Sequence, residues 1–207
     1  IEMLAVRRAK LDKENTDWRI HRDGWIRARK QAAYEAELDE LCGEAVNRQD
    51  FTEVFRLWDL GAGCQAENNY GHTALTMASA VESMVVNGDG QYVPAIALLL
   101  DREKARPDLN FETRNNMTAL TWAAKNGRTS ALQFLIDRGA NINYVCRDGK
   151  SALLHAAIAG QWLTVRLLLE RGADPFQRGN DGKTAVEYAL SRNLVGVARA
   201  INAARAG

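Results

Sequence analysis

Apolar residues recur at helical spacing in pairs of short segments through most of the chain. One such segment follows Thr118 and runs to Gly127, and a second spans residues 131–138 and stops before Gly139. Apolar side chains three and four positions apart predict amphipathic helices. Thr118 is a favourable N-cap residue, and Gly readily takes the left-handed conformation in which helices end. This stretch therefore predicts two short helices joined by a tight turn.

The same helix pair is repeated along the chain at a regular interval. A Thr or Ser followed by Ala and an apolar residue opens each copy, and the last three copies start 33 residues apart. Asp148-Gly149 and Asp181-Gly182 are turn signals between copies. A unit of this length cannot bury its apolar face alone, so successive units are expected to stack into a solenoid. The four copies open at Thr73, Thr118, Ser151 and Thr184.

The repeated unit resembles an ankyrin repeat over about residues 37–207. Each unit keeps much of the family pattern: a turn with Gly, then Thr-Pro-Leu-His, Ala-Ala, Gly, Leu-Leu and Gly-Ala-Asp. All four copies have Ala in place of the family Pro, which preserves the helix start because Ala is an excellent helix former. The resemblance implies an all-α ankyrin-repeat solenoid of about five helix-turn-helix units with atypical end caps. The family His is replaced by Thr76, Thr121, Leu154 and Glu187.

We expect the chain to divide into a basic amphipathic helical arm, residues 1–36, and an ankyrin-repeat domain, residues 37–207. The second unit is too long, because Thr73 and Thr118 are 45 residues apart rather than 33. Most of the surplus falls at residues 82–91, where Asn87-Gly88 predicts a turn and hence a protruding finger. The expected units are about 37–67, 68–112 with this insertion, 113–145, 146–178 and 179–207.

Charge separates the arm from the array. Residues 1–30 hold nine Lys and Arg against five Asp and Glu, whereas the rest of the chain holds 18 against 21. A basic amphipathic helix is typical of segments that bind acidic surfaces, protein partners or calmodulin-like proteins. Trp18 and Trp25 lie in this arm, and their large apolar faces need cover from the array or from a partner. We therefore expect them to provide a second contact. The array lacks the basic patch of a nucleic-acid-binding protein, so no nucleic acid is expected.

The sequence carries no recognisable catalytic, phosphate-binding or metal-binding motif. Its three cysteines show no CxxC spacing, which favours a reducing, intracellular compartment, either the cytoplasm or the cytoskeleton. Cys42 is expected in the core, and Cys146 is expected to be exposed at a turn tip. No apolar run is long enough to span a bilayer. We expect no enzyme activity, no cofactor and no metal.

The resemblance also implies where a protein partner would bind. In ankyrin repeats the turn tips and the exposed sides of the inner helices line a concave surface. Tyr70, Arg114, Met117 and Arg147 are the expected anchors, because Tyr and Arg are enriched at interface hot spots. Trp58, Trp122 and Trp162 are expected to lie mainly in the core. The candidate contact residues are Asn69, Tyr70, His72, Arg114, Asn115, Met117, Lys125, Asn126, Arg147, Asp148 and Lys150.

Three functions remain open from the sequence. The first is a non-catalytic scaffold that binds a protein partner through the array. The second is a fixed structural component of a large cytoskeletal, ciliary or organelle complex, with the basic arm on an acidic neighbour such as tubulin. The third is calmodulin-type binding through the N-terminal helix.

Overall fold

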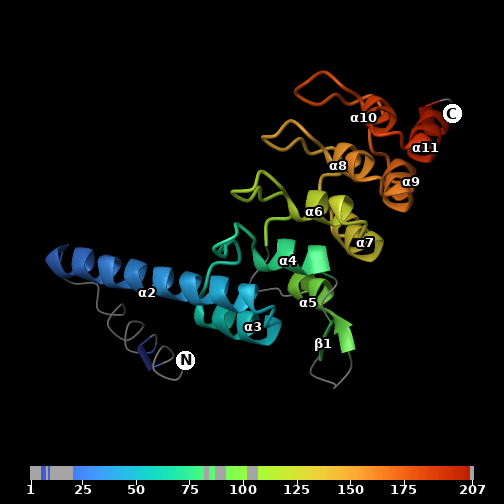
Figure 1. Ribbon diagram of the computed structural model, residues 1–207. Coiled ribbons are helices and arrows are strands. Elements are labelled where there is room, and N and C mark those ends of the chain that lie inside the picture. Colours follow the sequence, from blue (N-terminus) through green and yellow to red (C-terminus); the bar gives the residue numbers. More distant parts are fainter. Residues whose placement is uncertain are drawn as a thin grey trace.

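The computed structural model describes residues 6, 7, 9, 21–81, 84–86, 92–101 and 107–205, with the backbone alone for 21–30, 84–86, 92–93 and 205. Within this part of the chain, helices form five successive pairs that stack in one row (Figure 1). This arrangement confirms the expected all-α repeat fold. The pairs are α2 (His21–Asn47) with α3 (Phe51–Leu60), α4 (Ala74–Val81) with α5 (Ala95–Asp101), α6 (Ala119–Lys125) with α7 (Thr129–Asp137), α8 (Ala152–Ala159) with α9 (Trp162–Glu170), and α10 (Ala185–Ser191) with α11 (Val195–Arg205).

The repeated Thr is the helix cap that the sequence predicts. Thr118 precedes α6, and its Oγ1 accepts a hydrogen bond from the backbone N–H of Thr121 at 3.3 Å. The Oγ1 of Thr121 accepts in return from the N–H of Thr118 at 2.8 Å. Thr184 and Glu187 form the same reciprocal box before α10. Residues at the position of the family His therefore close the helix start, and two backbone donors that the helix leaves free are satisfied.

Every turn before an inner helix contains one residue in the left-handed conformation at the same place. Gly occupies it in three turns, and Asn116, with φ of 55°, occupies it in the fourth. Asn is the non-glycine residue that most readily tolerates this conformation, because its short polar side chain adds little steric cost. The four turns can therefore share one backbone shape despite the substitution.

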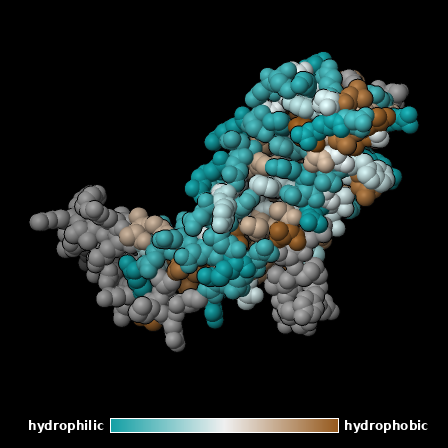
Figure 2. All heavy atoms as spheres, in the orientation of Figure 1, coloured by the Kyte–Doolittle hydropathy of each residue, from teal (hydrophilic) through white to brown (hydrophobic). Residues whose placement is uncertain are grey.

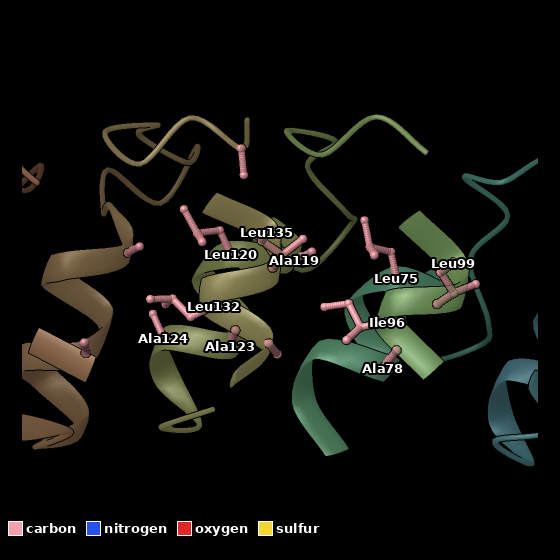
Figure 3. Packing of buried hydrophobic residues seen from close by; sticks show 14 of the residues in the cluster. Leu75, Ala78, Ile96, Leu99, Ala119, Leu120, Ala123, Ala124, Leu132 and Leu135 are labelled. Carbon is pink, nitrogen blue, oxygen red and sulfur yellow. The ribbon is translucent and has the colours of Figure 1, made fainter. Parts of the chain in front are cut away.

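The core runs along the stack as one continuous layer of small and branched apolar side chains. Ala119, Ala123 and Ala124 let α6 approach the inner helices on either side closely. Leu132 and Leu135 from α7 fill the space behind them (Figure 3). Close packing of this kind makes each buried Leu worth about 2–5 kcal/mol against truncation to Ala. Each unit is therefore stable only with its neighbours in place.

The inserted segment of the second pair contains an antiparallel hairpin, in the place where a finger was expected. Strand β1 (Met84–Val86) pairs with β2 (Tyr92–Pro94), and Val85 stands opposite Val93. The hairpin follows the C-terminal end of α4, whereas the turn loops precede the N-terminal ends of the inner helices. It consequently projects from the edge of the array away from the turn loops (Figure 1). Residues 82–83 and 87–91 lie outside the described residues.

Helix α2 continues from the expected arm into the first repeat without a break at residue 36. Tyr34, Leu38 and Cys42 are buried on its array-facing side. The guanidinium of Arg7 lies 5.9 Å from the centroid of the Tyr34 ring and pairs with Glu37 at 2.5 Å. The first half of α2 extends well beyond the stack (Figure 1). Trp18 lies outside the described residues, and for Trp25 only the backbone, within α2, is described.

The array tryptophans differ in burial. Trp58, in α3, is buried in the first helix pair. Trp122 is half-buried on the inner side of α6. Trp162 is 54% exposed, so the expectation that it lies in the core is wrong. It is the first residue of α9, and that helix directs Thr164, Val165 and Leu168 into the core instead.

The last unit ends the stack. Leu190 is exposed, whereas Ala157 and Ala124, at the same place in the two preceding units, are buried under the next inner helix. Hydrophobic residues gather near this end of the array in Figure 2. Such an atypical final unit is what a one-dimensional stack requires where one face meets water.

Candidate functional site

Four turn loops project from one side of the stack (Figure 1). We call the exposed sides of turns 67–73, 112–118, 145–151 and 178–184, together with the exposed C-terminal end of α6, the turn strip. Hydrophilic residues cover most of this side (Figure 2). Each turn is closed by a backbone hydrogen bond between its second and sixth residues, so the tips have a fixed shape. These bonds run from the N–H of Asn68 to the O of His72, Thr113 to Met117, Cys146 to Lys150 and Gly179 to Lys183, at 2.9–3.1 Å.

The first tip is held by a buried asparagine. The Oδ1 of Asn68 accepts hydrogen bonds from the backbone N–H groups of Tyr70 at 3.0 Å and His72 at 2.9 Å. This local bonding turns the chain so that Asn69 and Tyr70 face solvent, and Tyr70 is 72% exposed. A large aromatic ring held this openly on a rigid turn is a feature of recognition surfaces.

Arg114 joins the first tip to the second. Its backbone N–H donates to Oε1 of Glu67 at 2.8 Å, its Nε donates to Oε2 of the same carboxylate, and its Nη2 donates to the O of Asn68 at 2.5 Å. The Arg114 side chain is 63% exposed and that of Glu67 is 13% exposed. Asn115 adds a hydrogen bond from Nδ2 to the O of Tyr70 at 2.6 Å. The carboxylate thus lies beneath the guanidinium and fixes it.

Arg147 repeats this arrangement one unit later. Its backbone N–H donates to Oε1 of Glu112 at 2.8 Å, and its Nε lies 3.8 Å from the same oxygen. The Arg147 side chain is 75% exposed and that of Glu112 is 7% exposed. The hydroxyl of Tyr144 donates to the other oxygen of Glu112 at 3.3 Å. A buried carboxylate with several donors is well satisfied, which keeps it in place under the arginine.

An aromatic contact connects the first turn to the next inner helix. The rings of His72 and Trp122 meet edge to face, with centroids 4.6 Å apart and planes at 63°. Lys125, one turn further along α6, places its Nζ 5.1 Å from the Trp122 centroid. Burial lowers the pKa of His72, and Glu67 opposes this more weakly. The neutral imidazole therefore serves mainly as a packing surface for Trp122.

Asp148 and Lys150 neutralise each other rather than standing free at the third tip. The Nζ of Lys150 lies 3.1 Å from Oδ2 of Asp148, and both side chains are about a quarter exposed. The same Oδ2 lies 3.3 Å from Nε2 of His155. Burial lowers the pKa of His155 to about 4, with Asp148 opposing and Lys150 and Lys125 adding to the effect. At neutral pH this group carries no net charge.

Two sequence expectations about the turns need correction. Met117 is 5% exposed, so it lies under the turn strip and is not a surface anchor. Cys146 is also buried, because the second residue of each turn points into the array, and its Sγ lies 3.9 Å from Oγ1 of Thr121. Asn126 is exposed, but it is the C-cap residue of α6, and its Nδ2 donates a hydrogen bond to the O of Trp122 at 2.9 Å. The structure therefore brings Asn69, Tyr70, His72, Arg114, Asn115, Lys125 and Arg147 to one side.

The carboxylates Glu67 and Glu112 were not singled out from the sequence. They are 45 residues apart, the same interval that separates Thr73 and Thr118, so they occupy one place in successive units. The next unit has Val145 there, which breaks the series. The interval can be read from the sequence, but the contact of these carboxylates with the arginines can be inferred only once it is known which turns lie side by side.

The described residues offer neither a cluster of metal ligands nor a reactive thiol. Groups of three or more metal-ligating side chains are absent from them. Burial raises the pKa of the Cys42 thiol to about 12 and also raises the pKa of Cys64 and Cys146, so none is a reactive thiolate. Over the same described part of the chain, no helix combines the length and the apolar character needed to cross a membrane.

Comparison with known proteins agrees with this geometry. The family model described as ankyrin repeats, in three copies, matches residues 83–179. Residues 83–179 are therefore ankyrin repeats, as the resemblance of the units indicated. A comparison with curated proteins gives no match. Ankyrin repeats are generally protein–protein interaction modules and are typically not enzymes.

Proposed function

We propose that this array is a non-catalytic recognition module that binds a protein partner through the turn strip. The observation that carries the proposal is the pair of exposed arginines above buried carboxylates: the Arg114 side chain is hydrogen-bonded to Glu67, and Arg147 is hydrogen-bonded to Glu112 through its backbone and ion-paired with it at 3.8 Å. Exposed long side chains normally lose rotamer freedom on binding, at a cost of about 0.5–1.5 kcal/mol each. Here part of that ordering already exists in the free protein.

Tyr70 completes the proposed anchor set. Its side chain is exposed, and its backbone is held by Asn68 and Asn115. Aromatic and arginine anchors on a rigid frame are the residue types that dominate interface energetics. The surrounding contacts would come from the exposed candidates Asn69, Asn115, Lys125 and Asn126 and from the half-buried His72, with Asp148 and Lys150 at the edge.

We place this activity inside the cell, in the cytoplasm or on the cytoskeleton. All three cysteines are free thiols. Buried free cysteines suit a reducing compartment, where disulfides are rare. This supports the location without identifying the partner.

The proposal is tested by affinity capture with three baits. The first is the natural chain, and the second carries Tyr70→Ala, Arg114→Ala and Arg147→Ala. The third carries Trp162→Ala, Arg166→Ala and Arg199→Ala, a matched aromatic and two arginines exposed on the outer helices. We expect the strip variant to lose specific partners that the matched control retains, with thermal melts showing all three baits folded. Equal recovery by the first two baits would refute binding through the strip.

A second candidate function is that of a fixed component in a large cytoskeletal, ciliary or organelle assembly. It is favoured by the extension of α2 beyond the stack (Figure 1) and by the exposed Trp162, Leu163 and Val195 on the outer helices. In that case the basic arm would lie on an acidic neighbour such as tubulin. Light scattering after size exclusion separates the two. A monodisperse monomer supports the recognition module, and concentration-dependent association supports the fixed component.

Calmodulin-type binding through the N-terminal helix stays a third possibility on the basis of the arm's charge and its two tryptophans. A peptide covering residues 11–30 should then show a calcium-dependent gel shift with calmodulin. Absence of a shift removes this function.

A further inference from the structure

The cations of the turn strip are stacked above their carboxylates, so the two signs of charge are not equally accessible. Arg114 and Arg147 are 63% and 75% exposed, while the partner carboxylates are 13% and 7% exposed. A ligand that approaches from solvent therefore meets guanidinium groups first. The layer is nearly neutral in total, but its outer surface favours an anion.

The two guanidinium groups have unused hydrogen-bond donors. Arg114 uses its Nε and Nη2, and its Nη1 makes no hydrogen bond to any residue that the structure describes. Arg147 makes a 3.8 Å ion pair with Glu112 and no side-chain hydrogen bond among the described residues. A guanidinium offers five donors in a planar fork that matches a carboxylate. Each arginine can therefore take a carboxylate from a partner without releasing the one beneath it.

Lys125 extends the positive surface. It is exposed, lies over the Trp122 ring and forms no ion pair within the part of the chain that the structure describes. The remaining acidic residue of the first three turns, Asp148, is paired with Lys150. Between the first and third turns the strip thus presents three available cations and no unpaired carboxylate on its outer surface.

The repeat geometry gives the spacing between the two arginines. Arg114 and Arg147 occupy the same place in successive units, and their inner helices α6 and α8 pack side by side. Packed helices lie about 8–10 Å apart. A polyproline II segment rises about 3.1 Å per residue with three residues per turn, so side chains at i and i+3 share one face about 9 Å apart. In a flat β-strand, by contrast, positions i and i+3 point to opposite faces.

We propose that the turn strip binds an acidic, extended segment of a protein partner, with two carboxylates three residues apart on Arg114 and Arg147. This inference rests on the proposed recognition function and adds the chemistry and spacing of the partner. Tyr70, on the turn to which Arg114 is hydrogen-bonded, would contact a residue flanking the acidic pair, and Lys125 would strengthen the attraction.

The test uses labelled nine-residue peptides with two Glu residues at separations of two, three, four or seven in a Pro/Ala/Ser background. Binding to the full 207-residue chain is measured by fluorescence anisotropy at about 50 and 300 mM salt. We expect the tightest binding at a separation of three, with weaker binding at higher salt. Equal binding at all four separations would overturn the proposed register, and tightest binding at seven would indicate a helical partner instead.

Two pairs of substitutions separate the strip from general electrostatics. Arg114→Gln with Arg147→Gln should weaken the best peptide at least tenfold. Arg166→Gln with Arg199→Gln makes the same charge change on the outer helices and should alter binding less than twofold. Arg147→Gln alone removes no hydrogen bond of its side chain, so it tests the strip without threatening the fold, and we expect about a threefold loss. Equal losses in the strip and control pairs would overturn the proposal.

A final arm addresses nucleic acid. A single-stranded oligonucleotide of equal charge should displace the peptide at least tenfold less well than unlabelled peptide, and equal displacement would overturn the proposal. If affinity capture of partners depends on the turn strip but none of the peptides binds, this inference is wrong and the proposed function still holds. Peptide binding at the strip, with unchanged capture by the strip variant, would instead sink the proposed function.

Discussion

Asp148 Oδ2 lies 3.3 Å from Nε2 of the buried His155, yet the imidazole stays neutral. Burial lowers the pKa of His155 by more than Asp148 raises it, and repulsion from Lys150 and Lys125 lowers it further. The folded-state pKa of His155, about 4, is below the ordinary value of 6.5. The unfolded chain therefore takes up a proton on this residue at a higher pH than the folded array does.

This relationship predicts acid-sensitive stability. Above pH 6.5 His155 is neutral in the folded and the unfolded state, so it does not lower the free energy of unfolding. As the pH falls toward 4, the unfolded chain is protonated first and the free energy of unfolding decreases. At pH 5 this decrease amounts to about 2 kcal/mol from the shift alone. Urea denaturation at pH 7 and pH 5 should show this loss, and His155→Gln should remove most of it. The control His72→Gln should retain most of the pH dependence. A natural chain equally stable at both pH values would contradict the account.

Capping gives a second prediction, from two residues at the same place in successive units. Thr118 accepts a hydrogen bond from the helix it precedes, but Ser151 does not, and Leu154 lacks the hydroxyl with which Thr121 completes the box. The Oγ of Ser151 is buried and has no hydrogen-bond partner among the residues that the structure describes. Thr118→Ala should cost about 1 kcal/mol of unfolding free energy, and Ser151→Ala should cost almost nothing. Equal losses in chemical denaturation would show that capping is not the cause.

Much of the fold could be predicted because its determinants are local. The Thr caps, the turn glycines and the spacing of Leu and Ala act within one unit, and the 33-residue interval repeats them. Met117 and Cys146 show where local reasoning fails. Each lies in a turn that reads as polar and exposed, but Cys146, the second residue of its turn, and Met117, the sixth residue of its turn, are both buried. Their burial follows from the position of the neighbouring unit.

The candidate surface was predictable in part for the same reason. Tyr70, Arg114 and Arg147 could be placed on turn tips from the repeat alone. Glu67 and Glu112 could not be assigned beneath the arginines, because that contact joins residues 47 and 35 positions apart in two different units. The edge-to-face contact of His72 with Trp122 also crosses units. Contacts between units depend on the stacking offset, which a single unit does not contain.

A third prediction concerns the left-handed residue Asn116. It has φ of 55° in a turn position that is Gly in the other three turns. Within the described part of the chain, its side chain forms no hydrogen bond that would favour Asn. Asn116→Ala should lower stability by about 1 kcal/mol, because Ala tolerates this conformation poorly. Asn116→Gly should be neutral or slightly stabilising, since Gly adopts it freely. Thermal melts of the two variants test this directly. Two equal melting temperatures would mean that the backbone conformation is not what matters.

The stack itself gives the last prediction. Leu132, in the third helix pair, is fully buried, whereas Leu190 is exposed on the last unit. Leu132→Ala should lose about 2–5 kcal/mol through lost burial and the cavity it leaves. Leu190→Ala should change stability by less than about 0.5 kcal/mol, as surface substitutions do. Urea titration of both variants, followed by far-ultraviolet circular dichroism, measures the difference. A large loss in the Leu190 variant would mean that another surface covers the end of the array, because only a covered Leu can lose that much on truncation.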